Sequence, residues 1–135
     1  MTPLLIVGTN ATLIEGVAQI LTSEGYQLLF SRSLAESLDT VGDIRPLVVL
    51  VERSAIDEIR MTLRVPLSEG GAFLVFHGED ELPAPLPSGV QRSTLAELEL
   101  PLERQRLMTL LRYVETRAHA VGRDQPGNGA EVEVQ

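Results

Sequence analysis

Three short stretches of the chain are apolar at every position, and they constrain the fold more than any other feature. They are Leu4–Val7, Leu47–Val51 and Ala72–Phe76. A run of this length without polar alternation is typical of a β-strand buried on both faces. Such strands occur in parallel sheets that carry helices on each side, so the sequence predicts an α/β fold.

A helix is expected after the first apolar run. Asn10 or Thr9 can cap its start, because a short polar side chain accepts hydrogen bonds from the free N–H groups of the first turn. Gly25 stands where the end of a helix favours a residue that tolerates positive φ. Between these positions, apolar residues recur at helical spacing: Leu13, Val17, Ile20 and Leu21.

Two further strands and three further helices complete the expected order. The strands are predicted at Gln27–Ser31 and within Leu95–Leu100, and the helices from Ser33, over Ile56–Leu63 and from Glu103 to Ala120. Strands that alternate with helices predict a doubly wound, five-stranded parallel sheet with helices on each side. Ligand chemistry in such a sheet lies at the carboxyl ends of the strands.

A proline-rich segment follows the run that ends at Phe76. Leu82–Ser88 carries alternate prolines, which cannot propagate a helix, so the fourth helix of the fold is expected to be short or replaced by a loop. The segment is either a plain surface loop or a remodelled surface that binds a partner. Its candidate contact residues are apolar: Leu82, Leu86, Val90 and Leu98.

The composition suits one globular domain. We expect residues 1–120 to form it and residues 121–135, which begin with turn-forming residues and end with acidic ones, to be a disordered tail or linker. The absence of cysteine excludes disulfides and thiolate metal sites. A formal net charge of -8 disfavours direct binding to nucleic acid. No apolar run is long enough to cross a bilayer, so a cytoplasmic location is expected.

Three stretches of the sequence carry a family resemblance. They are Leu4–Asn10, which ends in Gly-Thr-Asn, then Arg45–Glu52, and then Leu100–Glu103 followed by Leu107. In this order and spacing they resemble the receiver domain of response regulators, the CheY-like module of two-component signalling. The resemblance extends from about Leu4 to Val114 and implies the receiver topology.

The resemblance also implies a phosphorylation site, but most of its groups are replaced in this chain. In the family, an acidic pair and an acceptor aspartate hold Mg²⁺, a cation that prefers oxygen ligands. Here Gly8 and Thr9 stand at the acidic pair, and Glu52 stands at the acceptor aspartate. His77 falls at the position of a Ser or Thr that holds a phosphoryl oxygen.

The last part of that site is also changed. Leu100 falls where the family has a lysine, and only Pro101, expected after a cis peptide bond, is retained. We therefore expect a degenerate receiver, or pseudo-receiver, that is not an enzyme and binds neither a metal nor a cofactor.

Two polar residues of this degenerate pocket are open to more than one interpretation. Glu52 is either a permanent carboxylate that mimics the phosphorylated form or a partly exposed acid without a role. His77 either pairs with Glu52, which would raise the pKa of the histidine, or is a bystander at the end of a strand.

The leading functional hypothesis is a phosphorylation-independent adaptor that binds a signalling or regulatory protein, alone or as a module of a larger regulator. A homodimer, through the last helix, is a further option. The alternative hypothesis is a flavodoxin-like domain that binds phosphate or a small molecule. In that case, the turn at Gly8–Thr12 would hold the ligand through its backbone N–H groups.

Overall fold

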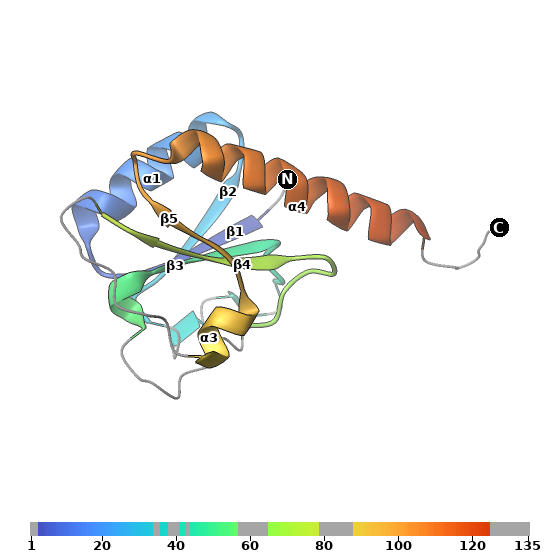
Figure 1. The fold of residues 1–135 in the computed structure, drawn as a ribbon, viewed down its shortest axis with the longest axis horizontal. Helices are drawn as coiled ribbons and strands as arrows, with labels where there is room; N and C mark the ends of the chain where they lie inside the picture. The colour runs from blue at the N-terminus through green and yellow to red at the C-terminus, as the bar shows by residue number, and fades with distance from the viewer. Residues whose placement is uncertain are drawn as a thin grey trace.

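The computed structural model describes residues 3–33, 36–37, 41–42, 44–56, 65–78 and 88–124. Within these ranges, five parallel strands form one sheet in the order β2-β1-β3-β4-β5 (Figure 1). This confirms the predicted doubly wound parallel sheet. The strands are β1 (Pro3–Val7), β2 (Gln27–Ser31), β3 (Val48–Glu52), β4 (Ala72–His77) and β5 (Thr94–Glu99).

Helices cover both faces of the sheet. α1 (Ala11–Ser23) and α4 (Arg104–Asp124) lie on one face, and the short helix α3 (Ser88–Ser93) lies on the other (Figure 1). The side chains of β1 alternate between the hydrophobic clusters on the two faces of the sheet. Its Leu4 and Ile6 belong to the hydrophobic cluster shared with α1 and α4, whereas Leu5 and Val7 belong to the cluster on the opposite face. All four side chains are fully buried, as the apolar run predicted.

The ends of α1 follow from local side-chain chemistry. Asn10, and not Thr9, caps the helix, because its Oδ1 accepts the N–H of Leu13 at 3.2 Å. The chain turns at Gly25 with a φ of 91°, which confirms the predicted role of this glycine.

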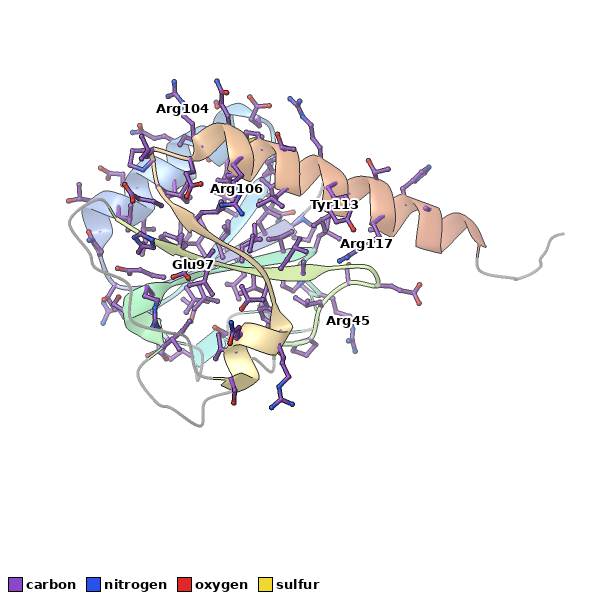
Figure 2. All side chains as sticks on the ribbon, in the orientation of Figure 1. Arg45, Glu97, Arg104, Arg106, Tyr113 and Arg117 are labelled. Atoms are coloured by element: carbon purple, nitrogen blue, oxygen red, sulfur yellow. The ribbon has the colours of Figure 1, made fainter. Side chains whose placement is uncertain are left out.

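α4 is fastened to the body of the domain by polar contacts near its middle. The Tyr26 hydroxyl donates to Glu115, and Nη2 of Arg117 donates to the carbonyl of Gly70 at 2.9 Å. Figure 2 shows Arg117 on α4. Burial and the hydrogen bond to Glu115 raise the pKa of Tyr26. The helix continues to Asp124, past the predicted end at Ala120, and residues 125–135 lie outside the described residues.

The remaining predicted helices are described only in part. The segment after β3 begins as a 3-10 helix (Arg53–Ala55), and residues 57–63 of the predicted third helix lie outside the described residues. α3 is a six-residue helix, in agreement with a shortened fourth helix. Within the described residues, no helix combines the length and the apolar character needed to cross a membrane.

Candidate functional site

The predicted site residues lie at the carboxyl ends of four strands. Gly8 follows β1, Glu52 ends β3, His77 ends β4 and Leu100 follows β5. Because the strands are parallel, these ends meet at one edge of the sheet. The topology therefore brings the four positions to the edge where receiver domains carry their chemistry.

Glu52 is the central residue of this edge, and it is buried. Its relative exposure is 2%, and its Oε1 accepts the backbone N–H groups of Thr9 at 2.8 Å and Asn10 at 3.1 Å. These N–H groups lie at the start of α1, where the helix dipole favours a negative charge. The expectation that Glu52 is partly exposed is therefore wrong.

Gly8 makes room for this carboxylate. A Cβ atom at position 8 would lie 2.3 Å from Oε1 of Glu52 and 2.7 Å from its Cβ, far inside van der Waals contact. A side chain at position 8 is thus incompatible with the observed position of Glu52. The glycine at position 8 and the glutamate at position 52 therefore form one steric unit.

Leu100 brings no charge to the site. Its side chain is fully buried in the cluster beneath α1 and α4, and its N–H donates to the carbonyl of His77 at 2.9 Å. The chain contains no lysine, and Glu52 forms no ion pair with any arginine among the described residues. The peptide bond between Leu100 and Pro101 is cis, as predicted.

The turn that holds Leu100 and Pro101 is closed by reciprocal hydrogen bonds. Oε1 of Glu103 accepts the N–H of Glu99 at 2.8 Å, and the N–H of Glu103 donates to the carbonyl of Glu99 at 2.8 Å. Arg106 donates to Oε2 of Glu103 at 3.1 Å. The Glu99 N–H and the nearby Arg106 guanidinium lower the pKa of Glu103. The chain's own side chains therefore supply the hydrogen bonds that close this turn.

His77 is buried but does not reach Glu52. Its relative exposure is 7%, and its Nδ1 lies 3.0 Å from the carbonyl oxygen of Gly78. A carbonyl can only accept, so Nδ1 carries the proton. No hydrogen bond or ion pair joins His77 to Glu52 among the described residues. The hypothesis that the two residues pair is therefore wrong in this structure.

Two of the four predicted contact residues are not at the surface. Val90 and Leu98 are both fully buried, so their assignment to an interaction surface is wrong. Val90, a residue of α3, belongs to the hydrophobic cluster of one face, and Leu98 belongs to the cluster of the other. Leu82 and Leu86 lie outside the described residues. Leu95 and Leu102 of the same part of the chain are exposed, at 38% and 68%.

The arrangement limits the chemistry that this edge can perform. No group of three or more His, Cys, Asp or Glu side chains that could hold a metal ion occurs within the described part of the chain. The N–H groups of Thr9 and Asn10 are bound to Glu52, so a phosphate at the Gly8–Thr12 turn would have to displace a carboxylate from the same chain. A neighbouring cavity of about 360 Å³, lined in part by Phe30 and Arg32, lies beside this turn.

The sequence reasoning did not identify the contact between Glu52 and the start of α1. The residue pattern offered one signal, which is that a glycine at position 8 accompanies a longer acid at position 52. This signal assigned residues 8 and 52 to one predicted site, but it did not show that their atoms touch.

Solved structures of receiver domains resemble this fold. A CheY-like response regulator receiver domain from Methanospirillum hungatei JF-1 is 16% identical, with a TM-score of 0.60, and the match covers 89% of this chain and 98% of the other. The N-terminal domain of a response regulator/sensory box/GGDEF three-domain protein from Carboxydothermus hydrogenoformans is 15% identical, with a TM-score of 0.67, and the match covers 88% and 98%.

A pseudo-receiver domain also matches. The pseudo-receiver domain of the CikA protein is 18% identical, with a TM-score of 0.60, and the match covers 84% of this chain and 97% of the other. No protein-family profile and no curated protein sequence matches the chain. The identities are low, so the similarity concerns the fold, and the fold is that of receiver domains.

Proposed function

We propose that this chain is a receiver-like signalling module that works without phosphorylation and acts by binding a protein partner. The observation that carries the proposal is the carboxylate of Glu52, buried and hydrogen-bonded to the N–H groups of Thr9 and Asn10. A charge from the chain itself occupies the edge where a receiver would take a phosphoryl group. The site then has one state, and no transfer reaction is needed to reach it.

Three features argue against phosphoryl transfer. The candidate nucleophile, Glu52, is 2% exposed and already holds hydrogen bonds through one of its oxygens. Gly8 offers no carboxylate for Mg²⁺, which would neutralise the charge that develops during transfer. Leu100 offers no cation for the phosphoryl oxygens and is buried in the core.

The contact of Glu52 also favours one of its two interpretations. An acid can act as a permanent substitute for a charged group only where donors receive its charge. The helix start supplies two such donors, although the lysine of the family is absent. We infer that Glu52 fixes a single conformation of this edge, and that partners recognise that conformation. The module is proposed to be a non-enzymatic protein of the cytoplasm.

Intact-mass spectrometry after incubation with acetyl phosphate and Mg²⁺ tests the phosphorylation part of the proposal. We expect no gain of a phosphoryl group, under conditions in which an intact receiver domain is modified. An adduct that disappears in Glu52→Gln would show that the position is still a phosphoryl acceptor. An adduct that persists in this variant would place the modification elsewhere and would also contradict phosphorylation independence.

The protein-binding part needs a separate measurement. A partner captured by the wild-type chain is expected to bind with the same affinity before and after treatment with acetyl phosphate. Affinity that rises only after the treatment contradicts the proposal. Leu102→Asp tests whether the exposed leucine in the turn between β5 and α4 contributes to this binding. Thr116→Asp, on the exposed face of α4, is the matched control.

A further inference from the structure

The two outer strands of the sheet differ in how their free edges are covered. β2 and β5 are the edge strands. On β5, the carbonyl of Glu97 accepts from Nη1 of Arg106 at 3.3 Å, and the N–H of Glu99 donates to Glu103 at 2.8 Å. Figure 2 shows Arg106 reaching from α4 toward β5. Side chains near the start of α4 therefore occupy part of the edge of β5.

Among the described residues, no side chain makes a comparable hydrogen bond to the edge of β2. The carbonyl of Ser31 accepts from Gly8 on β1 at 2.9 Å, so alternate residues of β2 face β1. Leu28 and Phe30 consequently direct their backbone N–H and C=O groups away from the sheet. Neither residue makes a hydrogen bond on that outer side within the described part of the chain. The strand Gln27–Ser31 also carries no charge and no proline, which are the usual features that keep an edge strand from pairing.

The side chains of β2 are compatible with pairing to an identical strand. Leu28 and Phe30 are two residues apart and share the face that α1 covers. Phe30 is 50% exposed. In an antiparallel pair centred on Leu29, Phe30 of each copy lies opposite Leu28 of the other. Both residues then exchange their outer hydrogen bonds with the second copy, and the apolar pair covers the exposed ring.

Charges of opposite sign stand at the two ends of this strand. Glu24 precedes β2 and Arg32 follows it, and both are exposed. Antiparallel pairing sets the carboxyl end of one β2 beside the amino end of the other. Each Arg32 therefore approaches Glu24 of the second copy, so the ends attract each other, whereas a parallel pair would set like charges side by side.

We propose that β2 is a self-association edge, at which two copies of the chain pair antiparallel and join their sheets into one. The occupant is a second copy because the apolar pairing and the end charges are both self-complementary. The inference does not rest on the proposed function, since a module that took phosphate could pair in the same way. It also places the dimer contact at β2 and not at the last helix.

A single-cysteine experiment tests the register. The chain has no cysteine, so Leu29→Cys introduces the only thiol. Residue 29 faces its own copy at a non-hydrogen-bonded position, where Cα atoms lie about 4.5 Å apart, within reach of a disulfide. We expect oxidised Leu29→Cys to run as a covalent dimer on a non-reducing gel, whereas Gln27→Cys, which faces Ser31 of the second copy, stays monomeric. Equal cross-linking of the two variants contradicts the register.

Charge reversal tests the ends of the strand by sedimentation equilibrium of the full chain. Glu24→Arg and Arg32→Glu are each expected to raise the dimer dissociation constant roughly tenfold, and the double variant is expected to restore it. Phe30→Lys is expected to abolish the dimer, with Leu95→Lys on the opposite edge strand as the matched control. A wild-type chain that stays monomeric at millimolar concentration, or a double variant that shows no recovery, overturns the proposal.

Discussion

Oε1 of Glu52 lies 2.8 Å from the backbone nitrogen of Thr9 and accepts its hydrogen bond. This contact ties the end of β3 to the start of α1, with Gly8 between them. In a parallel sheet these two ends form the edge at which ligands are expected. The chain thus supplies its own anion, the carboxylate of Glu52, at this edge. Gly8, Leu100 and Glu103 position this carboxylate or hold the edge around it.

Glu52→Ala is expected to lower the free energy of unfolding by about 2 kcal/mol, because two N–H groups lose a charged acceptor in a buried position. Glu52→Gln keeps an oxygen acceptor and should cost about half as much. Denaturation by urea measures both. Glu15→Ala, on the exposed face of α1, is the control and should change stability by less than about 0.5 kcal/mol. A loss for Glu52→Ala no larger than that of the control would contradict the structural role.

Gly8→Ala should destabilise the fold by about 1–3 kcal/mol, because the new Cβ collides with Glu52. Part of this cost should disappear in the Glu52→Ala background, which removes the closer of the two contacts. The double-mutant cycle should therefore show a coupling of about 1 kcal/mol. Gly16→Ala on α1 meets no atom within 4 Å and should instead stabilise by about 0.5–1 kcal/mol. Additive effects at positions 8 and 52 would rule out the collision.

Leu100→Lys introduces the residue type that the resemblance to receiver domains would place there, yet it should destabilise the fold by about 3 kcal/mol or more, because it buries an unpaired charge in the core. Leu102→Lys, two residues further on and 68% exposed, should change stability by no more than about 0.5 kcal/mol. Thermal unfolding followed by circular dichroism compares the two. A Leu100→Lys variant as stable as Leu102→Lys would mean that the site still accommodates the lysine.

Glu103 contributes a pH dependence whose sign follows from its contacts. Its pKa is lowered in the folded state by the Glu99 N–H and by Arg106, so its charged form stabilises the fold. That contribution is present above the usual carboxyl pKa and is lost as the pH falls through the lowered pKa of Glu103. The stability difference between wild type and Glu103→Gln should shrink as the pH falls. A difference that stays constant with pH would contradict the assignment, and Glu15→Gln provides the baseline.

Most of the fold could be predicted because the positions of the strands can be recognised from the residue pattern. The run at Leu47–Val51 predicted β3 to within one residue, since a strand buried on both faces leaves a continuous apolar signature. The bounds of the edge strand β2 also agree with the prediction. The end of α4 was less predictable. The helix passes through Gly122 to Asp124, and a single glycine lowers the helical propensity without ending the helix.

The site could be predicted in residue type but not in geometry. The positions of Gly8 and Glu52 follow from their order along the chain, but the direction of the Glu52 side chain depends on donors more than 40 residues away. Val90 and Leu98 were misassigned for a related reason. Periodicity identifies an apolar face, but it does not say whether that face packs on the core or on a partner.

An amide NMR titration with Mg²⁺ and beryllofluoride, the mimic of a receiver's phosphoryl group, tests the central claim most directly. The carboxylate of Glu52 already occupies the N–H groups of Thr9 and Asn10, so we expect no saturable shift at Gly8, His77 or Leu100. The same titration of Glu52→Ala shows whether the carboxylate itself closes the site. Saturable shifts in the wild-type chain, centred on these residues, would contradict the account, because they would show that the pocket still binds phosphoryl-like ligands.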